Sequence, residues 1–145
     1  MIALIQRVRE AEVRVADESV GHIDHGILAL IGVEREDGSA NAKRLAERLL
    51  SYRIFQDAED RMNLSVQDVE GGLLLVPQFT LAADTKKGNR PGFSTAAAPE
   101  RAQALFDELV VQVRARYAPV ATGRFGAEMH VSLVNHGPVT FWLQA

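Results

Sequence analysis

The segment from Ile27 to Val33 is apolar apart from Gly32, and it constrains the fold more than any other part of the chain. A strand with one face in solvent alternates apolar and polar residues, whereas a strand covered on both faces stays apolar. We therefore expect 27–33 to be a central strand. It is far too short to span a membrane, which takes about 20 apolar residues.

Shorter segments around it also have strand patterns. Ala11, Val13 and Val15 alternate with charged residues, as in a half-buried strand. Pro77 has no N–H group, so a strand that contains it must be an edge, an end or a bulge at that point. Besides the central strand, the sequence predicts strands over residues 1–8, 11–15, 19–23, 53–56, 64–69, 73–81, 122–125, 130–134 and 139–143.

Two segments have helical periodicity. The first follows a possible cap at Asp37 or Ser39, and the second starts near Pro99 and runs to about Tyr117. Their apolar stripes are Ala42, Leu45, Ala46, Leu49 and Leu50, and Ala102, Leu105, Phe106, Leu109, Val110 and Val113. With no linker or repeat, the chain is expected to be one mixed α/β domain over 1–145, with stacked β-sheets and two helices on one face.

Composition excludes several kinds of chemistry. The absence of cysteine rules out disulfides and thiol catalysis, and no histidine has a recognised metal-ligand spacing, so no metal or cofactor is expected. A net charge of −3 argues against a broad nucleic-acid-binding face, and no DNA partner is expected. Because charge appears by Arg7, a signal peptide is not expected. The expectation is a soluble cytoplasmic protein.

Three segments can carry chemistry, and each has a plainer reading. Thr80 ends an apolar strand and can be a nucleophile, but no base is placed beside it by sequence, so it can equally be structural. Gly137-Pro138 reads as a turn by spacing alone, although a cis bond there would aim two carbonyl groups the same way. A basic cluster of Lys86, Lys87 and Arg90 lies in a loop over 83–95 and can be merely solvated.

Taken together, these segments resemble the D-aminoacyl-tRNA deacylase family over the whole chain. The resemblance rests on residues 1–8, 52–55, 78–85, 122–125 and 137–144. It is most specific in the pairing of Gln78-Phe79-Thr80 with Gly137-Pro138-Val139-Thr140.

The resemblance implies a homodimer that hydrolyses the ester of D-aminoacyl-tRNA and of glycine mischarged on alanine tRNA. Its partner is then the aminoacylated 3′ end of tRNA, bound at the subunit interface. By carry-over, Gln78, Phe79 and Thr80 line the reaction centre, and a cis Gly137–Pro138 bond sets chirality from the other subunit. Arg7 would brace this motif, Phe125 and Met129 would form the adenosine and substrate pocket, and Lys86, Lys87 and Arg90 would meet tRNA phosphates.

Two positions depart from the family pattern. Pro77 stands where serine is common and supplies neither hydroxyl nor N–H, and His136 stands where aspartate is common. Pro77 keeps open the alternative of a non-catalytic nucleic-acid- or ligand-binding homologue, and a scaffold dimer is a third alternative. His136 can add pH sensitivity near the Gly-Pro bond or simply face solvent.

Overall fold

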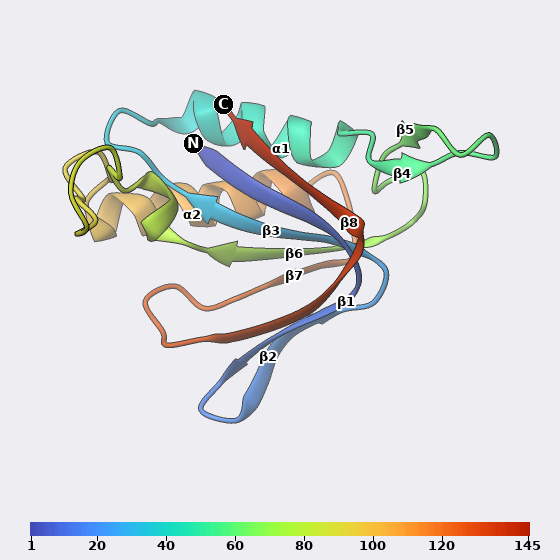
Figure 1. The fold of residues 1–145 in the computed structure, drawn as a ribbon, viewed down its shortest axis with the longest axis horizontal. Coiled ribbons are helices and arrows are strands. Elements are labelled where there is room, and N and C mark those ends of the chain that lie inside the picture. The colour runs from blue at the N-terminus through green and yellow to red at the C-terminus, as the bar shows by residue number, and fades with distance from the viewer.

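A computed structural model describes all residues, 1–145, as one mixed sheet with two long helices packed on it (Figure 1). Its strands are β1 (Ile2–Val15), β2 (Glu18–Ile23), β3 (Gly26–Gly32), β4 (Phe55–Gln56), β5 (Met62–Leu64), β6 (Gly72–Pro77), β7 (Val120–Thr122) and β8 (His130–Gln144). Its helices are α1 (Ser39–Ser51), the 3₁₀ helix η1 (Phe79–Ala82) and α2 (Pro99–Arg114). None of the helices is long and apolar enough to cross a membrane.

The main sheet runs in the order β2-β1-β3-β6-β7, and β8 also pairs with β1. The β3–β6 and β6–β7 pairs are parallel, and the other pairs are antiparallel. β3 therefore lies between two strands, which confirms the predicted central strand. β4 and β5 form a separate small hairpin.

The long strands β1 and β8 both bend where their pairing register shifts, between Gln6 and Ala11 of β1. On one side of the bend β1 pairs with β3, and on the other it pairs with β2. The sheet thus turns over on itself (Figure 1). The predicted mixed α/β class is confirmed, and the stacked layers are halves of one continuous sheet.

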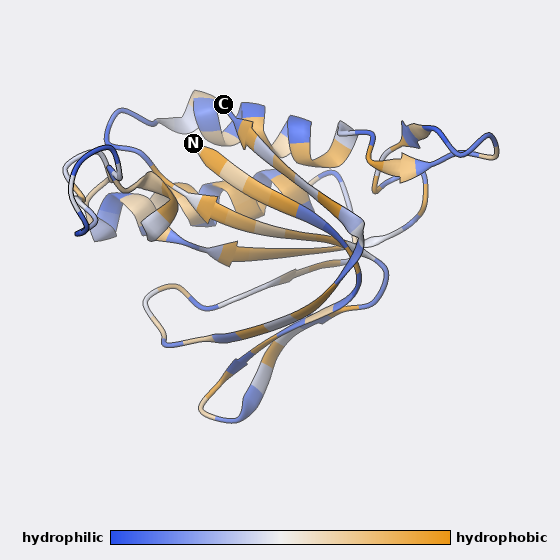
Figure 2. Cartoon of the chain, in the orientation of Figure 1, coloured by the Kyte–Doolittle hydropathy of each residue, from blue (hydrophilic) through white to orange (hydrophobic).

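Two apolar cores follow from this shape. The larger lies between the helices and the upper half of the sheet, where both predicted helical stripes are buried. The smaller lies between the two halves of the sheet and includes Val13, Leu28 and Leu74. Figure 2 shows apolar residues along the central strands and on the helix sides that face them. The central strand β3 contributes residues to both cores, as its unbroken apolar run predicts.

Several predicted boundaries were wrong. The chain leaves β5 after Leu64 and residues 66–70 form turns, because the Asp68 carboxylate accepts hydrogen bonds from the N–H and hydroxyl groups of Ser65, at 2.7 and 2.8 Å. The strand predicted over 73–81 ends at Pro77 and gives way to η1, so the proline does mark a strand end. The second helix ends at Arg114 and not near Tyr117, and β7 overlaps the predicted 122–125 only at Thr122. The segments 130–134 and 139–143 belong to one bent strand, β8.

Candidate active site

The segment Gln78-Phe79-Thr80 leaves the carboxyl end of β6 and enters the short helix η1. The amide Nε2 of Gln78 donates to the hydroxyl Oγ1 of Thr80 at 2.5 Å, and no histidine, lysine or carboxylate hydrogen-bonds to that hydroxyl. A threonine nucleophile needs an adjacent base. The geometry therefore gives Thr80 no means of activation from its own chain.

A largely apolar cavity of about 450 Å³ opens beside this segment. It brings together Gln78, Phe79, Phe125 and Met129, all of which the resemblance had placed near the substrate, but Thr80 does not line it. The half-buried Pro77 forms part of the wall. Remaining lining residues are Val76, Ala97, Pro99, Ala102, Gly126, Ala127 and Val131. A cavity of this size and lining suits a nucleoside or a small aromatic group.

Aromatic side chains extend the cavity wall outward. The ring of Phe79 is 57% exposed and packs against the ring of Phe93 with centroids 5.2 Å apart. Phe93 is itself 42% exposed, so the two rings form a small exposed apolar patch beside the cavity. Phe93 belongs to the loop over 83–95, so this loop lies directly beside the cavity. Sequence reasoning did not single out Phe93.

Gly137 and Pro138 lie inside β8, between Asn135 and Thr140, where the strand leaves its pairing with β1. This stretch, which we call the Gly137–Pro138 turn, is held by hydrogen bonds from two side chains. Arg7 is 5% exposed; its Nε donates to the carbonyl oxygen of His136 at 3.0 Å, and its Nη1 donates to that of Ile54 at 2.8 Å. Asn135 bridges to Val139 with a pair of hydrogen bonds, each 3.1 Å long. The bracing role that the resemblance implied for Arg7 thus has a geometric basis, and Asn135 is a second brace that the sequence did not reveal.

Gly137 has a backbone conformation open to few other residues. Its φ is +143°, and a Cβ atom added there would lie 2.6 Å from Cγ2 of Val139 and 2.9 Å from its nitrogen. The peptide bond from Gly137 to Pro138 is cis, as is that from Ala118 to Pro119. Both Gly137 and Pro138 are exposed, so the main chain of this turn is accessible to another molecule.

The turn and the cavity lie at opposite ends of the sheet. Arg7 of β1 bonds beside Gly137 and pairs with Ile27 of β3, which in turn pairs with Leu73 near the start of β6. The cavity, in contrast, begins at Pro77, at the end of β6. At ~3.3 Å per residue and ~4.8 Å per strand, the two are separated by roughly 20 Å. Figure 1 shows the bend of β8 at one end of the molecule and η1 at the other. One chain does not bring its own Gly137 to its own Gln78.

The basic loop residues Lys86, Lys87 and Arg90 are exposed beyond η1. The loop is closed by a β-bridge between Asp84 and Gly92, and the N–H of Lys86 donates to Oδ1 of Asp84 at 3.0 Å. The three cations therefore lie on a defined loop, and Lys86 lines a separate hollow with Leu81 and Trp142.

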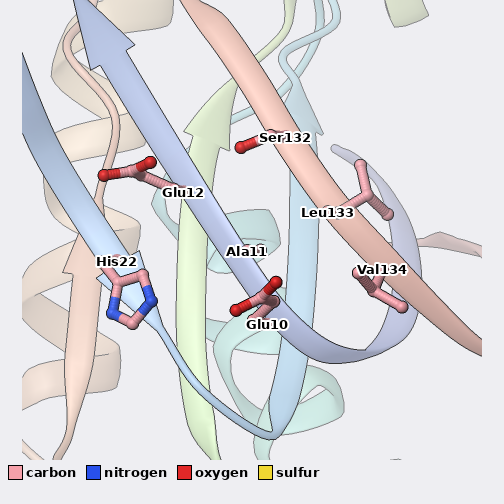
Figure 3. A pocket seen from close by; sticks show the side chains of 7 residues that line it. All are labelled: Glu10, Ala11, Glu12, His22, Ser132, Leu133 and Val134. Atoms are coloured by element: carbon pink, nitrogen blue, oxygen red, sulfur yellow. The ribbon is translucent and has the colours of Figure 1, made fainter.

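Figure 3 shows a second hollow, between β1, β2 and β8, lined by Glu10, Glu12 and His22. A hydrogen bond from Ser19, followed by the nearby charge of Arg14, lowers the pKa of Glu12, which therefore stays ionised and is a poor general acid. No group of three or more histidine and carboxylate side chains is arranged to hold a metal ion. Glu12 bonds to Arg14 and His22 lies beside Asp24, and no hydrogen bond joins Glu10, Glu12 and His22 to one another, so the apolar cavity beside Gln78 is the stronger candidate.

Comparison with known proteins shows the family of this chain. The fold is that of aminoacyl-tRNA deacylases. The family model described as D-Tyr-tRNA(Tyr) deacylase matches residues 4–144, and the chain belongs to that family. A D-aminoacyl-tRNA deacylase of Vibrio cholerae serotype O1 is 62% identical over 145 residues, covering 100% of both chains. The prediction of an aminoacyl-tRNA deacylase is thus confirmed at the level of the family.

Solved structures show the same fold. One described as c-Myc DNA Unwinding Element Binding Protein is 36% identical, with a TM-score of 0.95 over 100% of this chain and 99% of that chain. Another, described as a probable eukaryotic D-amino acid tRNA deacylase, has a TM-score of 0.86 at 19% identity, covering 99% and 98% of the two chains. At that identity the second likeness concerns the fold alone.

Proposed function

We propose that this protein hydrolyses the ester bond of D-aminoacyl-tRNA in the cytoplasm, releasing the free D-amino acid and tRNA. The observation that carries the proposal is the cavity beside Gln78 and Phe79, which has space for the terminal adenosine and no nucleophile–base pair. An aminoacyl ester is already reactive, so a site that positions it and stabilises charge can suffice.

The proposed active site is completed by a second copy of the chain. The Gly137–Pro138 turn is exposed, braced, and too far from its own cavity to line it. In a two-fold symmetric dimer, each turn can enter the other copy's cavity, because such interfaces are reciprocal. Exposed apolar side chains on β8 support a covered face there: Val134 is 46%, Phe141 36% and Trp142 52% exposed.

In the proposed reaction, water attacks the ester carbonyl and the ribose oxygen leaves with a proton. The hydroxyl vicinal to the ester assists, because neither Gln78 nor Thr80 has a base beside it. The first N–H groups of a helical turn have no acceptor inside the turn, so those of Phe79 and Thr80 are suited to bind the developing oxyanion. One such donor typically lowers the barrier by about 3–4 kcal/mol.

Chirality is read by exclusion in this proposal. The Gly137–Pro138 main chain holds the substrate ammonium and Cα–H, so an L side chain would collide with backbone while a D side chain points outward. A difference of about 3–4 kcal/mol gives several-hundred-fold discrimination. Glycine has no side chain to reject, so glycine mischarged on alanine tRNA is also proposed as a substrate. Lys86, Lys87 and Arg90 are proposed to contact phosphates near the acceptor end.

The test compares purified protein on D-tyrosyl-, L-tyrosyl- and glycyl-tRNA, with release of free amino acid as the readout. D-selective turnover with cleavage of glycyl-tRNA supports the proposal. Binding without turnover would instead identify a non-catalytic binding homologue, and sparing of glycyl-tRNA would contradict exclusion. Thr80→Ala is expected to retain activity in single-turnover assays, since a loss near the ~10⁶-fold seen for true nucleophiles would contradict its supporting role.

A further inference from the structure

Four side chains that carry or can carry positive charge gather beside the Gly137–Pro138 turn. Arg7 and Arg9 come from β1, His25 from the turn between β2 and β3, and His136 from β8. The Nη2 atom of Arg9 lies 3.5 Å from Nε2 of His136, and the two histidine rings are 6.4 Å apart between centroids. The cluster therefore brings cationic groups from three chain segments into one small region.

No carboxylate of the chain lies within ion-pair distance of this cluster. None of the four side chains takes part in an ion pair, whereas the exposed His22 nearby lies 3.8 Å from the carboxylate of Asp24. Arg7 uses its donors on main-chain carbonyls and leaves its charge unpaired. An uncompensated cluster of this kind favours binding of an anion.

The ring of His136 holds Arg9 in place. Arginine can only donate, so Nε2 of His136 accepts from Arg9, and the buried Nδ1 has no hydrogen-bond partner. His136 therefore positions Arg9 and does not itself contact an anion in solvent. Burial, then the charges of Arg9, Arg7 and His25, lower the pKa of His136, while burial and the two arginines lower that of His25. Phe55, against the ring of His25 at 5.1 Å, adds no charge.

The position of the cluster identifies the anion. Arg9 and His25 are exposed, and they lie beside the turn that, in the proposed dimer, enters the second copy's cavity. A tRNA whose 3′ end fills that cavity brings phosphates to its rim. We propose that Arg9 and His25, with Arg9 positioned by His136, form a phosphate site in trans that binds the acceptor end of a tRNA held in the other copy's cavity. This inference rests on the proposed function. In it, one copy binds the 3′ end of the tRNA in its cavity and the other copy binds a phosphate of the same tRNA.

Arg9→Gln tests the inference directly. A labelled acceptor-stem RNA hairpin ending in CCA serves as the probe, with affinity followed by fluorescence anisotropy between about 50 and 200 mM KCl. Losing one phosphate contact should reduce the slope of log affinity against log salt by about one. Arg14→Gln is the matched control, since Arg14 is also an exposed arginine of β1 but lies 3.3 Å from Glu12. Its slope should equal that of the unsubstituted protein.

The histidines provide a second readout. Phosphate favours the charged imidazole, so affinity for the hairpin should rise as the pH falls from about 8 to about 6. The double substitution His25→Asn with His136→Asn should remove this rise, whereas His22→Asn should keep it. A D-tyrosyl-adenosine amide, which has no phosphate, should bind all variants equally; weaker binding to Arg9→Gln would mean that the cavity itself was disturbed and would overturn the assignment.

An unchanged salt slope in Arg9→Gln would overturn the phosphate site. So would a shift of its monomer–dimer equilibrium without a change of slope, because the cluster would then pair with a carboxylate of the second copy. Failure of the proposed function is distinguishable. If the unsubstituted protein cleaves D-tyrosyl-tRNA while Arg9→Gln keeps its salt slope, only the phosphate site is wrong. If the unsubstituted protein cleaves nothing, the proposed function is wrong.

Discussion

The side-chain oxygen Oδ1 of Asn135 accepts a hydrogen bond from the N–H of Val139 at 3.1 Å, and its Nδ2 donates to the Val139 carbonyl at the same distance. The two residues enclose Gly137 and Pro138. Nδ2 also donates to the carbonyl oxygen of Arg7 at 3.3 Å, which ties the turn to β1. Because the main chain is held on both sides, its carbonyl groups point in fixed directions. Main-chain groups that recognise a substrate need such fixed directions.

Asn135→Asp tests whether the hydrogen bonds of Asn135 hold the turn in the conformation that catalysis needs. Aspartate keeps the acceptor for the Val139 N–H but loses both donors and turns a carboxylate toward two carbonyls. At about 1–3 kcal/mol for an unsatisfied polar contact, kcat/KM for D-tyrosyl-tRNA should fall by roughly 10–100-fold. The ratio of D to L cleavage should fall with it. Asn63→Asp is the control because the Asn63 side-chain oxygen bonds only to Arg53; an unchanged D-to-L ratio in Asn135→Asp would refute the bracing role.

Gly137→Ala should destabilise the protein as well as inactivate it. The added Cβ would overlap Val139 at 2.6 Å, and alanine rarely adopts a φ of +143°. Strain of this kind costs about 1–3 kcal/mol, measurable by urea unfolding. Gly92→Ala is the matched case, since its Cβ would meet Asp84 at an ordinary 3.7 Å. Equal unfolding free energies for the two variants would show that the backbone around Gly137 relaxes to accept a Cβ atom, and would contradict the expected strain.

The two histidines near the turn should make stability depend on pH. In the fold the pKa values of His25 and His136 are lowered, first by burial and then by arginine charges, from the ordinary value near 6.5. Below about pH 6.5 the unfolded chain binds more protons than the fold, so stability present above that pH is lost as the pH falls toward the lowered values.

Melting temperatures between about pH 8 and pH 5 test this dependence. The double variant with asparagine at positions 25 and 136 should lose less stability than the unsubstituted protein, while His22→Asn should match the unsubstituted protein. The carboxylates with lowered pKa values, those of Glu12, Asp57 and Asp68, protonate below this window. If the melting temperatures of the double variant and of the unsubstituted protein fall equally with pH, these histidines gain no proton on unfolding.

The sequence predicted those elements whose pattern is local. The apolar run at Ile27 marked β3, and the two helical stripes marked the buried faces of α1 and α2. Pro77 indicated an edge, an end or a bulge, because a missing N–H acts at its own position; the structure has the end there, although the strand was predicted to continue to residue 81. The turn at Ser65 was missed because a side-chain carboxylate three residues later overrode strand propensity.

Such local patterns do not predict which residues far apart in the sequence lie close together in the fold. The register of β8 on β1 decides that Gly137 lies far from Gln78, and register depends on pairing between segments distant in sequence. The brace from Asn135 and the cluster around His136 were hidden for the same reason. Spacing alone gave Gly137-Pro138 as a turn, and only its similarity to a known family indicated a part in a site shared between two chains.

The measurement that tests the central claim most directly is complementation between two inactive variants. Gln78→Ala alters the cavity and Gly137→Ala alters the turn, so each alone should have little activity on D-tyrosyl-tRNA. If the turn acts in trans, mixed dimers contain one site with both parts intact, and an equimolar mixture that exchanges subunits should recover about a quarter of the original activity. A mixture that forms mixed dimers and stays as inactive as its components would contradict a site completed by the second copy.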